Sequence, residues 1–104
     1  MKENYNQTNL IEKLSIGIKM LNIPNIVTPE EEDAFFKLIS ENVKRIRKEK
    51  KMSQLEVALS IGQKAPGFYA NMENYAHGKH FNLSHLFRIA KLFDVSIEEL
   101  FKKA

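Results

Sequence analysis

The sequence contains no cysteine, which excludes disulfides, thiolate zinc sites and cysteine nucleophiles. It also lacks any apolar run approaching the roughly 18 residues of a membrane span. Its first residues, MKENYNQTN, are too polar for a signal peptide. We therefore expect a cytoplasmic protein with no membrane partner.

The common signatures of catalysis are absent as well. The four glycines form no phosphate-binding loop, and there is neither an HExxH zinc signature nor a nucleophile elbow. His77, His80 and His85 lie within nine residues, but no cysteine or acid lies among them, so we expect polar or phosphate-facing side chains and no metal site. The 104 residues fit one domain and leave little room for a separate catalytic domain. We expect neither an enzyme nor a cofactor.

Charge is distributed unevenly along the chain. Residues 1–34 hold three lysines and six acidic residues, a net charge of −3, whereas residues 35–104 hold 13 basic and seven acidic residues, a net charge of +6. A basic folded part behind an acidic lead is typical of a protein with a polyanionic partner. Ordinary solubilising charge explains the same distribution, so charge alone does not decide between the two.

Segment 6–22 has apolar residues at helical spacing, namely Leu10, Ile11, Leu14, Ile18 and Leu21. Pro24 ends this predicted amphipathic helix, because a residue before proline is disfavoured in the α region. The apolar face can pack on the chain's own domain or on a second copy. We divide the chain into an N-terminal extension with this helix, residues 1–27, and a domain, residues 28–104.

The next predicted helix runs from Pro29 to about Lys50. Thr28 is its N-cap, Pro29 suits the first turn, and Glu31 is placed to close a capping box. Its core stripe consists of Phe36, Ile39, Val43 and Ile46, widened by Phe35 and Leu38. The cations at 44–51 suit a helix C-terminus, and a solvated face accounts for part of that run.

Two short helices joined by a bend at Gly62 follow. Ser53 caps the first, Glu56 completes a second capping box, and Gly62 ends the helix. Pro66 fits the first turn of the second helix, which is predicted to run to about Tyr75.

The second of these helices has an inward and an outward side. Met72 follows Phe68 and Tyr69 by one turn, which defines the inward side. The outward side and the leading end have small residues and amides but no acid: Gln63, Lys64, Gly67, Ala70, Asn71 and Asn74. A helix fits the major groove of DNA, where Asn and Gln pair with adenine and Lys reaches guanine or phosphate. At the preceding helix start, Ser53 and Gln54 are expected to meet a backbone phosphate.

Two more predicted helices complete an all-α bundle. Asn82 caps the first, whose predicted core face consists of Leu83, Leu86, Phe87, Ala90 and Phe93. Ser96 and Glu99 are expected to form a third capping box. That box opens a last helix whose core residues are Ile97, Leu100 and Phe101.

An ordered set of residues runs through this part of the chain: Ser53-Gln54, Val57-Ala58, Gly62, Met72-Glu73-Asn74, Leu86, Ala90, Leu92 and the ending from Phe93 to Phe101. In order and spacing the set resembles the phage-repressor-like (Cro/C1, XRE) helix-turn-helix family, over about residues 35–101. The resemblance implies a compact bundle of five helices and a sequence-specific DNA-binding transcriptional regulator. It also implies that Gln54 contacts phosphate, that the region from Gln63 to Asn71 reads bases, and that Glu73 anchors the recognition helix.

The segment from Gly62 to Glu73 departs from the family pattern, because it has one residue more than usual. The sequence therefore allows two registers of the recognition helix, which differ by one position. Either Phe68 or Tyr69 takes the usual core position and the other is exposed, or both lie in the core. An exposed Phe68 would be able to touch a thymine methyl group.

The loop from Tyr75 to His80 is also longer than the family pattern. By the same resemblance, we expect Lys79 and His80 to lie along the phosphate backbone.

The function expected from the sequence is a repressor that binds double-stranded DNA and reads its major groove with the helix at about residues 65–75. A homodimer is a further expectation, because two-fold helix-turn-helix dimers read palindromic sites. The alternative is an antitoxin-like or adaptor module that binds a protein partner through the N-terminal apolar helix.

Overall fold

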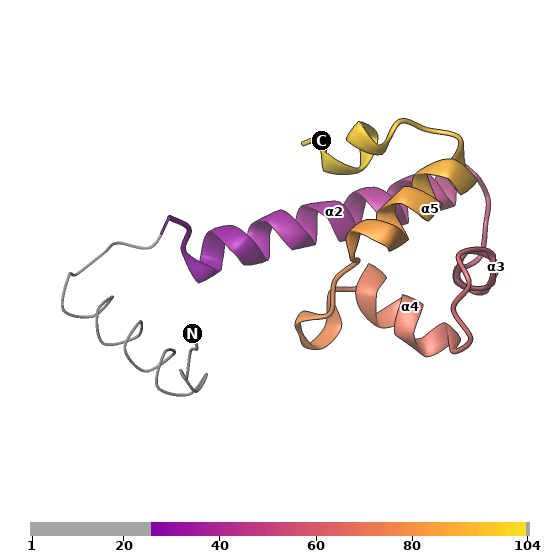
Figure 1. The fold of residues 1–104 in the computed structure, drawn as a ribbon, viewed down its shortest axis with the longest axis horizontal. Coiled ribbons are helices and arrows are strands. Elements are labelled where there is room, and N and C mark those ends of the chain that lie inside the picture. Colours follow the sequence, from indigo (N-terminus) through magenta and orange to yellow (C-terminus); the bar gives the residue numbers. More distant parts are fainter. Residues whose placement is uncertain (1–25, 104) are drawn as a thin grey trace, which may run out of the picture.

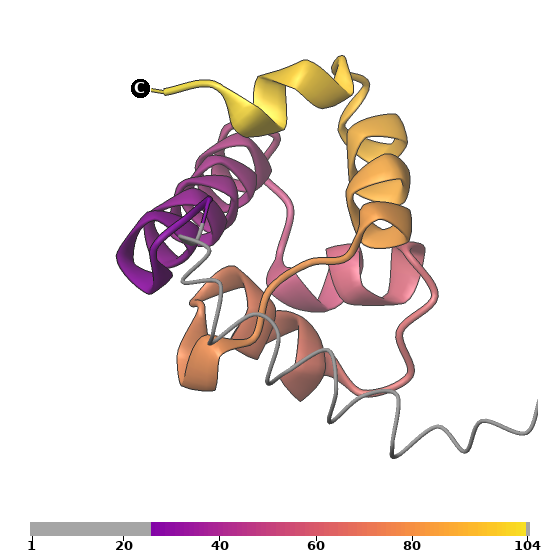
Figure 2. The ribbon, with the colours of Figure 1, turned by 60° about the vertical axis from the view of Figure 1, so that its left-hand side comes forward.

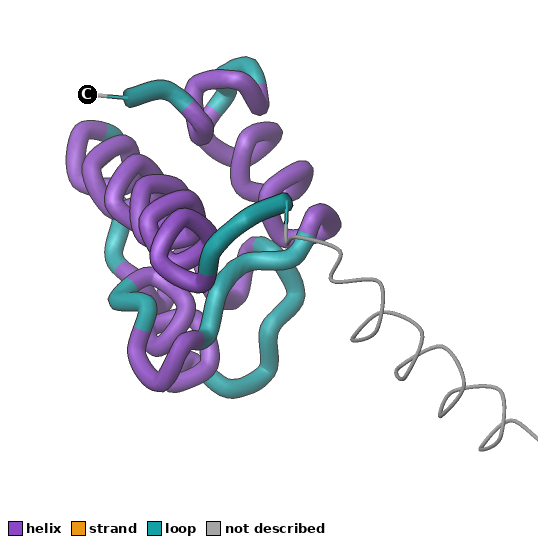
Figure 3. The backbone as a smooth tube through the Cα atoms, turned by 90° about the vertical axis from the view of Figure 1, so that its left-hand side faces the viewer, coloured by secondary structure: helices purple, strands orange, loops and turns teal. Residues whose placement is uncertain are grey.

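A computed structural model describes residues 26–103, without the side chain of Pro66. These residues form the α-helices α2 (Pro29–Glu49), α3 (Gln54–Ser60), α4 (Pro66–Glu73) and α5 (Leu83–Phe93), and the 3-10 helices η1 (Ala76–Gly78) and η2 (Ile97–Phe101). Within 26–103 there is no strand, as Figure 3 shows, so the predicted all-α fold is confirmed. The helix predicted over residues 6–22 lies outside the described residues.

The long helix α2 packs against α4, α5 and η2. In Figure 1, α4 lies on one side of α2, while η2 and the C-terminal end lie on the other. The turned view of Figure 2 shows α2, η2, α5, α3 and α4 around a common interior, and each element contacts the next around this ring. No helix of the described part is long and apolar enough to cross a bilayer.

Apolar side chains from every element of the ring fill its interior. The buried set comprises Ile39, Val43, Ile46, Val57, Ala58, Ile61, Tyr69, Met72, Phe81, Leu86, Ile89, Ala90, Phe93 and Leu100. The prediction of Leu83 and Phe87 as core residues is wrong, because they are 77% and 59% exposed. The side of α5 that packs in the interior carries positions 86, 89, 90 and 93. Positions 83 and 87 lie at the outer edge of this buried side.

Three helices begin with reciprocal capping hydrogen bonds, and the N-cap residue of each is the one predicted from the sequence. In each, the cap side chain accepts the backbone N–H of the third helical residue at 3.0, 3.0 and 2.7 Å, and that residue's side chain accepts the cap N–H in return. The pairs are Thr28/Glu31, Ser53/Glu56 and Asn82/His85. In the third pair, an imidazole ring does what a carboxylate does in the others.

The last element differs from its prediction. Ser96 caps η2, but its Oγ accepts the N–H of Glu98 at 3.3 Å, and Glu99 instead pairs with Lys102. The predicted capping box of Ser96 and Glu99 is therefore wrong. The segment forms 3-10 turns, in which the cap reaches the second residue and not the third.

Two buried polar side chains of α2 tie other elements to it. Asn42 Nδ2 donates to the carbonyls of Leu100 and Lys102 at 3.0 and 2.7 Å, which fixes η2. Ser40 Oγ donates to the carbonyl of Met72 at 2.8 Å, which fixes the last turn of α4. The position of α4 thus depends directly on α2.

Candidate nucleic-acid interface

Gly62 sets the bend between α3 and α4. Its φ of +87° lies in the left-handed region that glycine adopts without a steric cost. The N–H of Gly62 donates to Leu59 at 3.1 Å and that of Gln63 to Ala58 at 2.9 Å, which together form a Schellman motif. A Cβ at Gly62 would lie 3.1 Å from Nη1 of Arg88, which donates to the carbonyl of Ile61, the C-cap of α3, at 2.8 Å. The chain therefore leaves α3 in a fixed direction.

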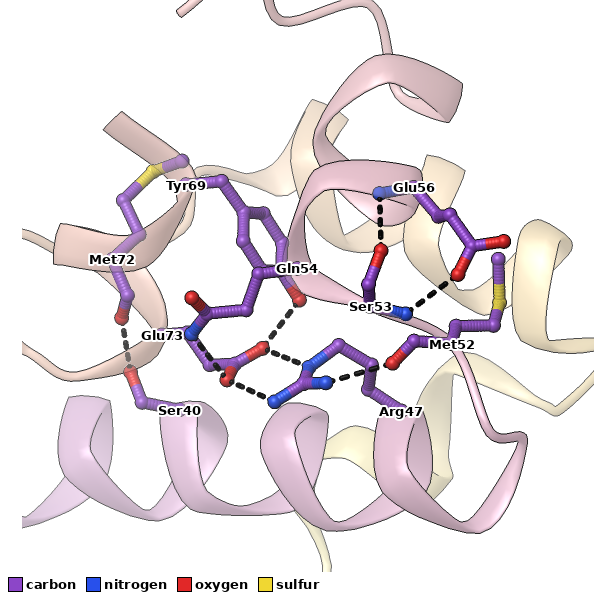
Figure 4. A network of polar contacts seen from close by, with 9 residues as sticks. All are labelled: Ser40, Arg47, Met52, Ser53, Gln54, Glu56, Tyr69, Met72 and Glu73. Atoms are coloured by element: carbon purple, nitrogen blue, oxygen red, sulfur yellow. Dashed lines mark hydrogen bonds and ion pairs between the residues drawn. The ribbon is translucent and has the colours of Figure 1, made fainter. Parts of the chain in front are cut away.

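The end of α4 is held by a buried ion pair between Arg47 of α2 and Glu73. Arg47 Nε and Nη2 donate to Glu73 Oε2 and Oε1 at 2.8 and 3.0 Å. Tyr69 Oη and Gln54 Nε2 donate to the same carboxylate at 2.7 and 3.0 Å, and Arg47 Nη1 donates to Met52 O at 2.7 Å. Figure 4 shows this carboxylate surrounded by donors from α2, α3 and α4. Glu73 thus anchors α4, as the family resemblance implies.

Burial and hydrogen bonding fix the charge states in this network. The side chains of Arg47 and Glu73 are 10% and 0% exposed. Burial raises the pKa of Glu73, but hydrogen bonds from Arg47, Gln54 and Tyr69 outweigh it, so the pKa lies below its ordinary value. The hydrogen bond to Glu73 raises the pKa of Arg47, and burial raises that of Tyr69. At neutral pH the network therefore consists of a guanidinium, a carboxylate and a phenol.

The same network fixes the register of α4. Tyr69 lies four residues before Glu73 on α4, and its hydroxyl donates to the Glu73 carboxylate. Tyr69 is fully buried in this position. Phe68 is 66% exposed, so its placement on the inward side is wrong. Of the arrangements left open by the sequence, Tyr69 in the core and Phe68 outside is the one observed.

The residues predicted to contact DNA separate into two groups. Lys64, Gly67, Phe68, Asn74, Lys79 and His80 are exposed and Asn71 is half-buried. A Cβ built on Gly67 has no neighbour within 4 Å, so this side of α4 is open to close approach. The side chains of the remaining residues, Ser53, Gln54 and Gln63, are hydrogen-bonded or close to other groups of the protein, although Ser53 itself is exposed.

Ser53 and Gln54 contribute to the start of α3. Ser53 Oγ accepts the N–H of Glu56, and the Gln54 amide donates to Glu73. An amide NH₂ group has two donors, so the bond to Glu73 is compatible with a phosphate contact by Gln54.

The amide of Gln63 is turned toward the ring of His85. Gln63 Nε2 lies 3.2 Å from His85 Nε2, and Gln63 Oε1 is buried with no hydrogen-bond partner in the described structure. His85 Nδ1 accepts the N–H of Asn82 at 3.2 Å, so the neutral ring has its hydrogen on Nε2. That donor is matched when the amide is rotated by half a turn and its oxygen faces the ring. The side-chain amide of Gln63 is therefore engaged with His85.

Acidification is expected to lower the free energy of unfolding as His85 titrates. Burial, then the charge of Arg88, lowers the pKa of His85 in the folded protein. The unfolded ring binds protons more readily, so the contribution of neutral His85 is complete above about pH 6.5 and is lost as pH falls through the lower folded-state pKa. Urea unfolding between about pH 7.5 and pH 5 measures this dependence.

The His85→Gln variant should show a weaker dependence than the wild type over that pH range. His77→Gln, at an exposed position, serves as the control and should keep the wild-type dependence. Equal dependence in the wild type and in His85→Gln would contradict the assigned role of the neutral ring.

The long loop after α4 is attached to the first half of α2. The ring of His80 stacks on Phe36 with 3.8 Å between centroids and 6° between planes. Tyr75, in the left-handed region at φ 52°, donates from its hydroxyl to Asp33 Oδ1 at 2.6 Å. These contacts leave Lys79 exposed beside α4.

The role of Arg47 was not predicted, because its position in a run of cations is also typical of a helix C-terminus. The available signal was its spacing, because Arg47 lies four residues after Val43 and next to Ile46, on the core stripe. A cation on a core stripe requires a buried partner, and Glu73 lies between core residues of another helix.

The second of the two short helices is presented to solvent while its end is anchored inside, an arrangement in which a helix can enter the major groove. This arrangement of α3 and α4 is that of a helix-turn-helix DNA-binding protein. A family model described as helix-turn-helix matches residues 43–100, more than half of the chain. The chain belongs to this family, in its Cro/C1 (XRE) type, and is a DNA-binding regulator of transcription. No curated protein and no solved structure matches the chain.

Proposed function

We propose that this protein binds specific sequences of double-stranded DNA with α4 in the major groove and represses transcription. The charge of the surface around α4 supports the proposal most strongly. Glu73 is the only acid between Gln63 and His80, and it is buried against Arg47. Lys64, two residues before α4, is exposed, and so is Lys79, which lines a recess with residues of α4. Within residues 63–80, the phosphates of DNA would meet cations and amides without an exposed carboxylate.

Base reading is assigned to the outward side of α4 and backbone contacts to its surroundings. The Asn71 amide has the donor and acceptor that pair with adenine N7 and N6. Gly67 permits the helix to approach the groove closely. The proposed backbone contacts are Ser53, Gln54, Lys64, Asn74, Lys79 and His80, and Gln63 reaches a base only after leaving His85.

Band shifts with genomic fragments across a salt series test this function. The proposal requires that some fragments are retained in preference to others and that retention weakens steeply as salt increases, because bound phosphates release counterions. Retention that is equal for all fragments, or no retention at low salt, would rule out specific reading.

Repression is proposed because occupancy of a promoter by the domain is sufficient to exclude another protein from the same DNA. Transcription in vitro from a promoter that overlaps a selected binding site should decrease with added protein. An increase in transcript would instead identify an activator.

A homodimer is proposed as the form that binds DNA, because helix-turn-helix dimers span two half-sites about one turn apart. Leu83 and Phe87 support a contact through α5, since they are exposed and one turn apart. Phe87 also lines a recess of about 390 Å³, together with Lys91 and Val95 among others.

Phe87→Glu is expected to raise the dissociation constant of the dimer by about tenfold or more, because a phenyl group leaves an apolar contact and a charge enters it. Sedimentation across a concentration series measures the change. Leu59→Glu, a similar change at an exposed position of α3, should leave the dimer intact. A wild-type protein that is monomeric at micromolar concentration, with and without DNA, would exclude the proposed dimer.

An antitoxin-like or adaptor function, with a polypeptide partner, is the second candidate. A groove of about 390 Å³ at the start of α2 favours it, lined by Val27, Glu31, Glu32, Phe35 and Phe36. In this candidate the partner is bound through the helix predicted over residues 6–22, which lies outside the described residues. Tight binding of a polypeptide together with absent DNA retention at low salt would favour this candidate over the first.

A further inference from the structure

Few hydrogen-bonding side chains are placed to read bases from α4. The amide of Gln63 is held at His85, and that of Gln54 donates to Glu73. On the outward side, Asn71 is the amide within α4 and Asn74 follows at its C-cap, while Gly67, Phe68 and Ala70 are small or apolar. Hydrogen bonds from such a helix can specify few base pairs, so apolar contacts must contribute to any sequence preference.

The largest apolar group on this surface is the ring of Phe68. Phe68 and Asn71 are three residues apart on α4, so their side chains are neighbours on one face. The ring of Phe68 is 66% exposed, and the other side of α4 is anchored in the interior. Covering this ring with a partner removes apolar surface from water, which lowers the free energy of the complex. In the major groove, the matching apolar feature of a base edge is the 5-methyl group of thymine.

A recess of about 220 Å³ lies beside this ring. Phe68 and Met72 give it apolar walls, and Asn71 contributes an amide to its edge. Its volume is several times the roughly 30 Å³ that a water molecule occupies in the liquid, so a methyl group and part of a base edge fit inside.

An A·T pair presents in the major groove the two features that these neighbouring side chains match. Adenine offers the N7 acceptor and the N6 donor that an asparagine amide pairs with, and thymine offers its methyl group. Resting on the proposed function, we infer that Phe68 is a specificity-determining residue. It packs on a thymine methyl group while Asn71 pairs with the adenine of the same or the adjacent base pair.

Replacement of thymine by uracil tests this inference, because it removes the methyl group and leaves base pairing unchanged. Each thymine of a selected binding site is replaced in turn, and affinities are measured for the wild type and for Phe68→Ala. For the wild type, loss of a buried methyl group is expected to weaken binding about fourfold at one thymine of each half-site. For Phe68→Ala, thymine and uracil should bind equally at that position.

Leu59→Ala is the matched control, since it truncates another exposed apolar side chain, on α3. This variant should retain the full preference for thymine over uracil. Thermal unfolding of Phe68→Ala should match that of the wild type, because the ring is exposed.

Two outcomes would overturn the inference. In one, no thymine of the site shows a uracil effect in the wild type. In the other, Phe68→Ala keeps the wild-type ratio between thymine and uracil. Both outcomes leave specific binding itself intact, whereas the absence of any selected sequence would refute the proposed function instead.

Discussion

Replacement of Glu73 by alanine is expected to lower the free energy of unfolding by about 3–5 kcal/mol. The substitution leaves the Arg47 guanidinium buried without its carboxylate and removes the acceptor of the Tyr69 hydroxyl. Removing one member of a buried pair costs the desolvation of the other, and it also leaves a polar group unsatisfied. Urea unfolding monitored by circular dichroism measures the effect.

Glu49→Ala is the control for this experiment, because Glu49 pairs with Arg45 on the exposed side of the same helix at 3.2 Å. An exposed pair of this spacing contributes about 0.3–0.5 kcal/mol, so the control should remain close to the wild type. The double variant Arg47→Met/Glu73→Leu removes both charges and should be destabilised less than Glu73→Ala. Equal, small effects of Glu73→Ala and Glu49→Ala would contradict the buried network.

The same substitution should change the response to acid. The pKa of Glu73 is lowered in the folded protein. The ionised carboxylate therefore contributes its full share to the free energy of unfolding above the unfolded-state pKa, and this contribution is lost as pH falls through the folded-state pKa. The difference in stability between the wild type and Glu73→Ala should therefore narrow below about pH 4.3. A difference that stays constant to low pH would show that the carboxylate charge is not the cause.

Asn71→Ala is expected to relax base preference at one position of the binding site, at a cost of about 1–3 kcal/mol for the preferred base. Asn71 is the amide in the middle of the outward side of α4, and alanine removes both its donor and its acceptor. Affinities for a selected site and for its single-base variants measure the change. The wild type should discriminate at that position, and Asn71→Ala should bind all four bases there about equally.

Lys79→Ala is the control for base reading, because an exposed lysine beside α4 is assigned to the phosphate backbone. It should weaken binding to all sequences by a similar factor and reduce the salt slope by about 1. Gln54→Ala should also weaken all sequences about equally. If Asn71→Ala and these two variants changed affinity in the same way, the division between reading and anchoring residues would be wrong.

The local features of the fold were predictable because a few adjacent residues determine them. Thr28 and Ser53 cap helices with glutamates three residues later, and Gly62 occupies the left-handed position that ends α3. Each depends on backbone groups within one or two turns, so the sequence alone contains the whole interaction.

Features that depend on residues distant in the sequence were not predictable to the same degree. Leu83 and Phe87 form an apolar stripe on α5 as regular as that of Leu86 and Phe93, and the packing of other helices chooses between them. The pairing of Arg47 with Glu73 joins residues 26 apart, and helical spacing does not show which carboxylate faces which cation.

The register of α4 lies between these two cases. The sequence restricted the core position to Phe68 or Tyr69, but both are aromatic and either fills a core. The choice follows from the polar end of tyrosine, which reaches the buried carboxylate of Glu73 while phenylalanine has no hydroxyl to do so. The exposed ring is a consequence of that buried hydrogen bond.

Selection of bound sequences from a random pool of duplex DNA shows whether α4 reads specific bases. We expect a two-fold symmetric motif with half-sites about 10 base pairs apart. Each half-site should contain an A·T pair whose selection is lost with Asn71→Ala. Recovery of random sequences by a protein that still retains DNA would contradict base reading by α4.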